Sequence, residues 1–119
     1  MESRKKDHIT LAYKAQLFEQ EVADLFDYEP FHQRVGLGIL IEKEFRHNNI
    51  GFEALQIISN YGLNILGIRN LYCGILADNK ASINLFEKAG FKNVGCRKNW
   101  YNDNGNWVDE YLYQKQLVK

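Results

Sequence analysis

The chain has 119 residues, of which 45% are hydrophobic and 25% are charged, and its 15 basic and 15 acidic residues give a formal net charge of zero. This length and composition are those of one ordinary globular domain, so we expect no second domain. The charge balance gives no reason to expect nucleic acid or a membrane surface as a partner, and a small molecule is the better expectation.

The cysteines and histidines do not suggest a metal site or a disulfide framework. Cys73 and Cys96 are few and far apart, which fits a reducing compartment, and we expect both to be buried or half-buried thiols. His8 and His32 have no other ligand type spaced to join them, so we expect surface residues. No apolar run near the N-terminus has the length of a signal peptide or a membrane span, so we expect a cytoplasmic location.

Three strands are expected at the start of the chain, over residues 9–18, 22–28 and 33–42. In the first of them the apolar residues fall at every second position, which is the period of a strand with one buried face. Pro30 supplies turn chemistry between the second and the third. Because no helical pattern interrupts the three strands, they should form an antiparallel meander.

Residues 35–55 read as an apolar strand, a short charged and amide-rich turn, and the start of an amphipathic helix. Gly36 and Gly38 lie inside the strand, where glycine marks a bulge or the close approach of a ligand; packing under a bulky neighbour is the alternative. A turn that leads straight into a helix leaves backbone N–H groups aimed outward, an arrangement that holds phosphate oxygens. We therefore expect a phosphorylated carrier to bind here.

The helix and the strand that follow it complete a crossover. Apolar residues repeat at helical spacing from Ile50, and the helix should end near Gly62 or Gly67. A short buried strand over residues 71–77 should then lie parallel to the strand before the helix, through a right-handed connection.

A second helix and a hairpin form the rest of the chain. Asp78–Asn79 offers an N-cap for this helix, and Gly90 follows its last turn. Two strands, over residues 94–101 and 107–117, flank the segment 102–106, which is a strong hairpin turn. The fold class is therefore α/β with a mixed sheet, in the order βββαβαββ.

Two segments resemble signatures of the Gcn5-related N-acetyltransferase (GNAT) superfamily. RHNNIG, residues 46–51, resembles its Q/R-x-x-G-x-G/A loop, and ADNKASINLFEKAGF, residues 77–91, resembles its second signature. Together with the NGNWVDEYLY hairpin, residues 104–113, the resemblance is closest to the branch of ribosomal-protein N-terminal and spermidine N-acetyltransferases, and it covers residues 20–117. It implies a GNAT-like acyl-CoA N-acyltransferase fold that lacks the N-terminal strand and helix pair, which form one wall of the acceptor site.

The strand and helix patterns, together with this resemblance, predict a division of the single domain, residues 1–119. The expected parts are a disordered start at 1–7, the antiparallel meander at 8–42, a coenzyme-binding βαβα unit at 43–91 and the C-terminal hairpin at 92–117.

The resemblance implies that acetyl-coenzyme A binds at the strand, loop and helix of residues 35–55. Backbone amides of the loop would hold the pyrophosphate, and the exposed edge of the strand would pair with the pantetheine arm. Asn79 would lie beside that arm or serve only as a helix cap, and Lys88 would approach the phosphates or be a solvated helix lysine. The coenzyme-binding residues expected on this basis are Ile39, Leu40, Ile41, Arg46, His47, Asn48, Asn49, Ile50, Gly51, Phe52, Asn79, Ser82, Phe86 and Lys88.

Some residues depart from the family pattern. Asn49 stands where the family usually has the first glycine of the loop, and asparagine tolerates a left-handed backbone. Phe86 stands where many members carry a tyrosine that protonates the leaving thiolate, and a phenylalanine cannot donate a proton. A thiol titrates near ~8.5, so a missing acid lowers the rate without forbidding the reaction. Val35 replaces a glutamate that some relatives carry, and the nearest polar candidates for a base are Glu42 and Tyr101, although both are the kind of residue usually found on a surface.

The resemblance implies an N-acetyltransferase that moves an acetyl group from acetyl-CoA to a primary amine of a peptide, polyamine or small metabolite. The alternative is a non-catalytic CoA-binding or partner-binding module, which Phe86, Asn49 and the missing acceptor wall favour. A nucleic-acid binder is a third, weaker possibility, because no basic stripe accompanies the aromatic residues. The chain is a fragment or a shortened member, or a second copy supplies the wall; we expect a homodimer.

Overall fold

The structure is a computed structural model of the chain, and it describes residues 23–39 and 50–118. The expected strand over residues 9–18 lies outside the described residues. So do Leu40, Ile41 and Glu42 and the loop residues Arg46, His47, Asn48 and Asn49.

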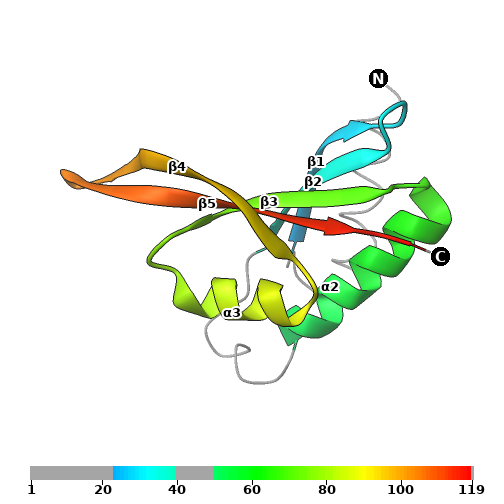
Figure 1. Ribbon diagram of the computed structural model, residues 1–119. Coiled ribbons are helices and arrows are strands. Elements are labelled where there is room, and N and C mark those ends of the chain that lie inside the picture. Colours follow the sequence, from blue (N-terminus) through cyan, green and yellow to red (C-terminus); the bar gives the residue numbers. More distant parts are fainter. Residues whose placement is uncertain (1–22, 40–49, 119) are drawn as a thin grey trace.

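Within the described residues, five strands form one mixed sheet in the order β1-β2-β3-β5-β4 (Figure 1). β1 (Ala23–Glu29) and β2 (Arg34–Ile39) are antiparallel, and β3 (Asn70–Leu76) lies parallel to β2. β5 (Asn106–Gln116) lies antiparallel to β3, and it also pairs with β4 (Lys92–Asp103), which forms one edge of the sheet. The expected mixed sheet and the parallel crossover strand are therefore confirmed.

Two helices, α2 (Ile50–Tyr61) and α3 (Lys80–Lys88), cover the same face of this sheet (Figure 1). One π-helical turn, η2 (Gly62–Leu66), extends α2. The turn ends at Gly67, whose φ of 68° lies in the left-handed region that glycine adopts without steric cost. Both glycines that the sequence offered as the end of the helix mark a boundary. Gly62 follows the last residue of the α-helix, and Gly67 follows the π-helical turn.

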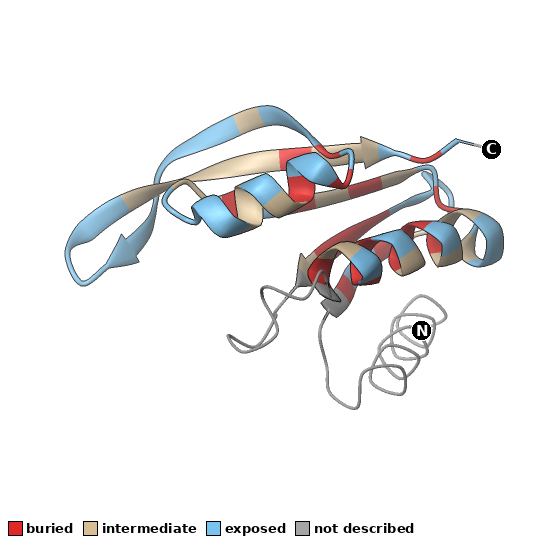
Figure 2. Cartoon of the chain, turned by 90° about the horizontal axis from the view of Figure 1, so that it is seen from below, coloured by how far each residue is buried: buried red, intermediate tan, exposed pale blue. Residues whose placement is uncertain are grey.

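The core lies between the two helices and the sheet, as Figure 2 shows from below. Every second residue of β3 faces the helices and is buried, which is the period expected for a strand with a filled face. The Tyr113 hydroxyl on β5 also donates a hydrogen bond to Glu87 Oε2 on α3 at 2.9 Å. The buried hydrophobic side chains are Leu25, Tyr28, Val35, Leu37, Ala54, Leu55, Ile58, Ile68, Leu71, Cys73, Ile75, Phe86, Ala89, Phe91, Tyr113 and Leu117.

The expectation of two buried or half-buried thiols was right for Cys73 and wrong for Cys96. Cys73 lies in the core, whereas Cys96 is exposed on β4. The reason is its position on β4, which lies at the edge of the sheet and has a neighbouring strand on one side alone among the described residues. His32 is exposed, as expected.

Asp109 fastens the middle of the β4–β5 hairpin, where the pairing register shifts between Arg97 and Tyr101. Its carboxylate accepts hydrogen bonds from the Asn99 backbone N–H at 2.8 Å and from Lys98 Nζ at 3.3 Å. Asn99 has a φ of 48°, so the backbone is left-handed at this bulge. The hydrogen bond from Asn99, followed by that from Lys98, holds the pKa of the Asp109 carboxyl below its usual value.

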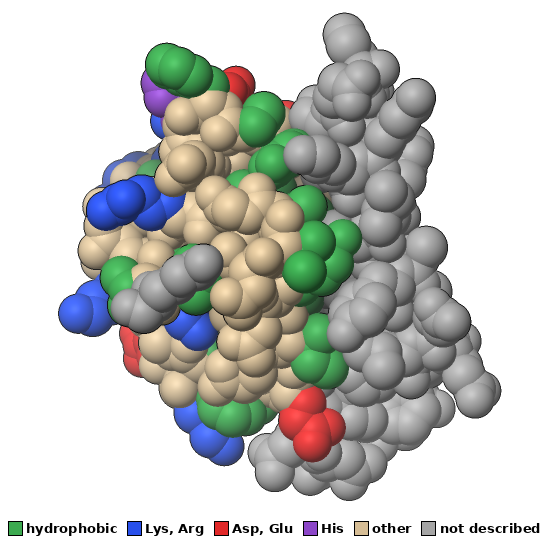
Figure 3. Space-filling view, turned by 90° about the vertical axis from the view of Figure 1, so that its right-hand side faces the viewer, with side chains coloured by type: hydrophobic (Ala, Val, Ile, Leu, Met, Phe, Trp, Pro, Cys, Tyr) green, Lys and Arg blue, Asp and Glu red, His purple; other side chains and the backbone are tan. Residues whose placement is uncertain are grey.

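Several large hydrophobic side chains remain exposed. In Figure 3, hydrophobic side chains form a band down one face, while Lys and Arg side chains are dispersed over it. No helix in the described part of the chain is long and apolar enough to cross a membrane. The exposed large hydrophobic residues are Phe26, Phe31, Ile65, Val94, Trp100, Tyr101, Trp107 and Val118.

Candidate functional site

β2 and β3 separate part-way along their length. They pair at Arg34–Asn70, Val35–Leu71 and Gly36–Tyr72, and no further pair joins them. β2 continues to Ile39 and β3 to Leu76, each still paired with its neighbour on the other side. The facing edges therefore carry backbone N–H and C=O groups that neither strand satisfies, and such groups need another hydrogen-bonding partner.

The two glycines of β2 lie on either side of the point of separation and serve different purposes. The Phe26 ring lies over Gly36, and a Cβ there would clash with it, so packing under a bulky neighbour is confirmed for this glycine. A Cβ on Gly38 would meet no described atom within 4 Å. Gly38 therefore keeps the gap free of side chains, as a ligand approaching the backbone requires.

A cavity of about 170 Å³ opens at this gap, on the side of α3. Its volume is below the roughly 300–1,000 Å³ of sites that hold drug-sized ligands, so it admits a narrow arm or a small group. Two larger hollows, of about 340 and 450 Å³, are lined by none of the residues that the sequence offered as site candidates. The residues that line the small cavity are Leu37, Gly38, Cys73, Gly74, Ile75, Leu76, Asn79, Ser82 and Phe86.

The start of α3 forms the polar rim of this cavity. Asn79 is the N-cap, and its Oδ1 accepts a hydrogen bond from the Ser82 backbone N–H at 3.2 Å. The cap role expected for Asn79 is therefore confirmed. The cap uses the oxygen, and the amide N–H₂ of the same side chain remains able to donate to a ligand.

The interior of the cavity is apolar and holds little acid–base chemistry. Phe86 is 2% exposed and packs edge-to-face on Phe91, with 5.0 Å between the ring centroids. Burial, and then the charge of Glu110, raises the pKa of Cys73 to about 12. Among the described lining residues Cys73 is the one ionisable group, and it stays a thiol at neutral pH.

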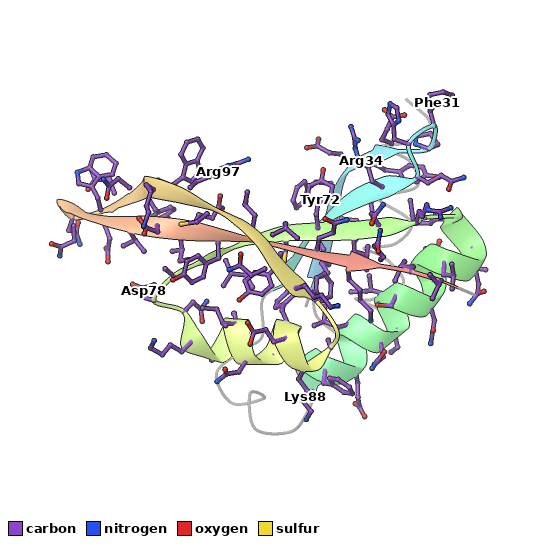
Figure 4. The ribbon with its side chains drawn as sticks, viewed as in Figure 1. Phe31, Arg34, Tyr72, Asp78, Lys88 and Arg97 are labelled. Atoms are coloured by element: carbon purple, nitrogen blue, oxygen red, sulfur yellow. The ribbon has the colours of Figure 1, made fainter. Side chains whose placement is uncertain are left out.

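The first turn of α2 meets the end of α3. Ile50 begins the helix, Gly51 is buried, and the Lys88 ammonium lies over the Phe52 ring at 4.9 Å from its centroid. Figure 4 shows Lys88 projecting from the end of α3 on the side of the sheet that the helices cover. A cation thus stands beside a helix N-terminus, and both favour an anion.

A family model described as an acetyltransferase (GNAT) domain matches residues 12–92. The chain belongs to the GNAT family. It is 29% identical over 82 residues to the uncharacterized N-acetyltransferase YoaA of Bacillus subtilis (strain 168), covering 69% of this chain and 46% of that one. Spermidine N(1)-acetyltransferase of Escherichia coli (strain K12) is 23% identical over 100 residues, covering 82% of this chain and 54% of that one. The chain therefore spans about half the length of these curated relatives.

Solved structures agree with the fold of this GNAT domain. A crystal structure of the spermidine N-acetyltransferase from Vibrio cholerae, in complex with CoA and spermine, matches it with a TM-score of 0.75 and 19% identity. The match covers 80% of this chain and 56% of that one. The family and the fold inferred from the sequence are thereby confirmed.

Not all of the sequence candidates come together in the GNAT domain. Asn79, Ser82 and Phe86 line the cavity, and Ile39 ends the strand beside it. Tyr101 does not line it: this residue is 53% exposed on the projecting hairpin, paired with Val108.

Sequence reasoning missed five lining residues, Leu37, Cys73, Gly74, Ile75 and Leu76. Their strands were predicted, but the point at which two parallel strands part leaves no mark on either strand alone. Among the described residues no group of His, Cys, Asp and Glu is arranged to hold a metal ion.

Proposed function

We propose that this GNAT domain transfers the acetyl group of acetyl-coenzyme A to a primary amine. The observation that carries the proposal is the separation of β2 from β3 beside the capped start of α3. The unpaired strand edges offer hydrogen bonds to the amides of a pantetheine arm, and the narrow apolar cavity suits the thioester at its end. Asn79 would hold the arm with the N–H₂ that its cap does not use.

The first turn of α2 would bind the coenzyme phosphates. Its unsatisfied backbone N–H groups, the helix dipole and the Lys88 ammonium all favour negative charge at this point. The preceding loop, with Arg46, His47, Asn48 and Asn49, belongs to this proposal on the ground of its sequence.

Transfer requires that protons move at two points. An ammonium first loses a proton, the free amine attacks the thioester carbonyl, and the C–S bond breaks as the carbonyl re-forms. The thiolate takes up a proton, and the amide nitrogen releases its second one. Phe86 cannot supply the proton for the thiolate, and Cys73 is too weak an acid to do so, so water would serve in this chain.

The proposal also covers the kind of amine that accepts the acetyl group. Relatives named spermidine N(1)-acetyltransferase favour a polyamine, while peptide N-termini and small metabolites carry the same amine group. A homodimer that completes the acceptor site and a cytoplasmic location also remain proposals; the exposed Trp100, Tyr101 and Trp107 favour association.

The second candidate is a CoA-binding module without catalysis, which the phenylalanine at position 86 favours. Calorimetry with acetyl-CoA and then free-thiol release with a panel of amines separate the two. Acetyl-CoA at 100 times its Kd should raise the unfolding free energy by about 2.7 kcal/mol. If saturating coenzyme does not stabilise the protein, both candidate functions are excluded. If acetyl-CoA binds but no amine is acetylated, the non-catalytic CoA-binding module is the function that fits.

A further inference from the structure

The face of the sheet opposite the helices carries a carboxylate over Gly74 of β3, beside the gap between β2 and β3. Residues of β3 and β5 alternate, so Tyr72, Gly74 and Glu110 point away from α2 and α3. Figure 4 shows Tyr72 and Arg97 on this open face, across the sheet from Lys88. Glu110 pairs with Arg97, with 3.3 Å between Oε1 and Arg97 Nη1.

The second carboxylate oxygen of Glu110 faces the gap. Oε2 lies against Gly74, and a Cβ on this glycine would collide with it. On the opposite strand, a Cβ on Gly38 would meet no described atom within 4 Å. Two glycines thus stand on the two sides of the gap, and neither places a side chain on the open face.

The same two glycines line the cavity on the helix side. Where the strands stop pairing, these glycines therefore stand between the apolar cavity on the helix side and the open face on which the Glu110 carboxylate lies. On the helix side, Phe86, Asn79 and Ser82 leave room for a narrow arm, so a second reactant reaches the thioester more easily from the open face.

We propose that Glu110 receives the acceptor amine on the open face and takes its proton. This inference rests on the proposed acetyl transfer. The carboxylate binds the ammonium, accepts one proton to become a carboxylic acid, and leaves a neutral amine to attack the thioester carbonyl through the gap. The C–S bond breaks, the nitrogen releases its second proton to water, water supplies a proton to the thiolate, and the acid returns its proton to solvent.

The charged and titratable groups around Glu110 fit this role. Arg97 on β4 holds Oε1 and keeps the carboxylate oriented, and its guanidinium also lies over the Trp100 ring at 4.8 Å from the centroid. Cys73 on β3 feels the charge of Glu110 and remains a thiol. Farther along the open face, the pKa of Tyr72 is raised by burial and Asp27 against the influence of Arg34. Among the described residues, Oε2 is thus the carboxylate oxygen that faces the gap.

The test compares Glu110→Gln with the full chain as it stands, using 1,4-diaminobutane and trifluoroethylamine as acceptors. The first is protonated at neutral pH and the second is not. Glu110→Gln should lower kcat/KM for the diamine by about 100-fold at pH 7, within the range of a lost general base. It should leave trifluoroethylamine within about twofold, because that amine is already neutral and needs no deprotonation before it attacks the thioester. The deficit with the diamine should shrink by up to about tenfold per pH unit as the free amine forms.

Asp103→Asn is the matched control, because it makes the same carboxyl-to-amide change at an exposed position on the same hairpin. It should behave as the parent chain with both amines. Gly74→Ala adds a second variant: the methyl group pushes the flexible end of Glu110 from the gap, so it should reproduce the diamine deficit while the protein stays folded.

Three outcomes would overturn the role of Glu110: equal loss with both amines, a deficit that does not change with pH, or no deficit in Glu110→Gln. Acetyl-CoA binding, measured by calorimetry on every variant, separates this failure from failure of the proposed function. Parent protein that binds acetyl-CoA and acetylates neither amine would overturn transfer, and the role of Glu110 with it.

Discussion

Phe86 belongs both to the core and to the cavity wall. Its ring packs edge-to-face on Phe91, and its side chain closes the apolar interior next to Cys73. A tyrosine at this position would keep most of that packing and add one hydroxyl, which could point into the cavity.

Phe86→Tyr should therefore raise kcat for acetyl transfer by about tenfold, which is less than the roughly 10²–10⁴-fold typical of general acid catalysis, because a thiolate already leaves readily. Stopped thiol-release assays at saturating acetyl-CoA check this. Phe91→Tyr is the control: it buries a hydroxyl outside the cavity, at a cost of roughly 1–3 kcal/mol of stability, and should not raise the rate. An unchanged rate in Phe86→Tyr would show that thiolate protonation does not limit the parent.

The two thiols should react very differently with a thiol reagent. Cys96 is exposed, whereas Cys73 is buried with a pKa raised to about 12. The folded protein at pH 7.5 should therefore release one equivalent of chromophore quickly, and a second only after unfolding. Cys96→Ser should abolish the fast phase. A fast phase that survives this change would contradict the burial of Cys73.

The helix α3 is capped by a residue that we also expect to contact the coenzyme. Asn79 caps the helix through Oδ1, and the role of its amide N–H₂ is the open question. Three substitutions separate the two functions, because aspartate and serine keep an acceptor oxygen for the cap but lack the amide N–H₂, whereas alanine lacks both.

Asn79→Ala should lower the unfolding free energy by about 1 kcal/mol, the usual value of a lost cap, and also weaken acetyl-CoA binding. Asn79→Asp and Asn79→Ser should preserve stability, since both residues cap well, while acetyl-CoA binds more weakly than in the parent. Urea unfolding and calorimetry measure the two effects. Full coenzyme affinity in Asn79→Asp would show that Asn79 acts as a cap alone.

Elements defined by local chemistry could be predicted from the sequence. Asn79 signals a helix start, Gly67 a helix end and the segment around Gly105 a hairpin, because each effect involves residues close in the chain. The site itself depends on contacts between distant residues. Glu110 on β5 contacts Gly74 on the neighbouring strand β3, and nothing in the sequence around either residue predicts this contact. The strand that contains Cys96 was predicted correctly. The burial of Cys96 was not, because it depends on which strand lies at the edge of the sheet.

Because Cys73 is buried, the stability of the whole molecule depends on pH in the alkaline range. Folding raises the pKa of Cys73 from 9.0 to about 12, so the folded state holds this proton more tightly than the unfolded state does. The contribution is fully present below pH 9 and is lost as pH rises toward 12. Burial also raises the pKa of Tyr113 and lowers that of Lys115, so a single pH curve mixes several groups.

A comparison with Cys73→Ala isolates the thiol, because the other groups are common to both proteins. Between pH 9 and 10.5 the parent should lose up to about 1.4 kcal/mol of unfolding free energy per pH unit more than the variant does. Urea unfolding at several pH values gives the two slopes. Parallel slopes would show that Cys73 titrates alike in the folded and unfolded chains.

The bulge on β4 also affects how this molecule meets other copies of itself. β4 forms an edge of the sheet, and an extended edge strand can recruit strands from neighbouring chains and start an aggregate. The left-handed backbone at Asn99 interrupts that row of hydrogen-bonding groups, and Arg97 and Lys98 place positive charge beside it. Asp109 stabilises the bulge, and we therefore expect it to disfavour pairing of this edge with strands of other copies.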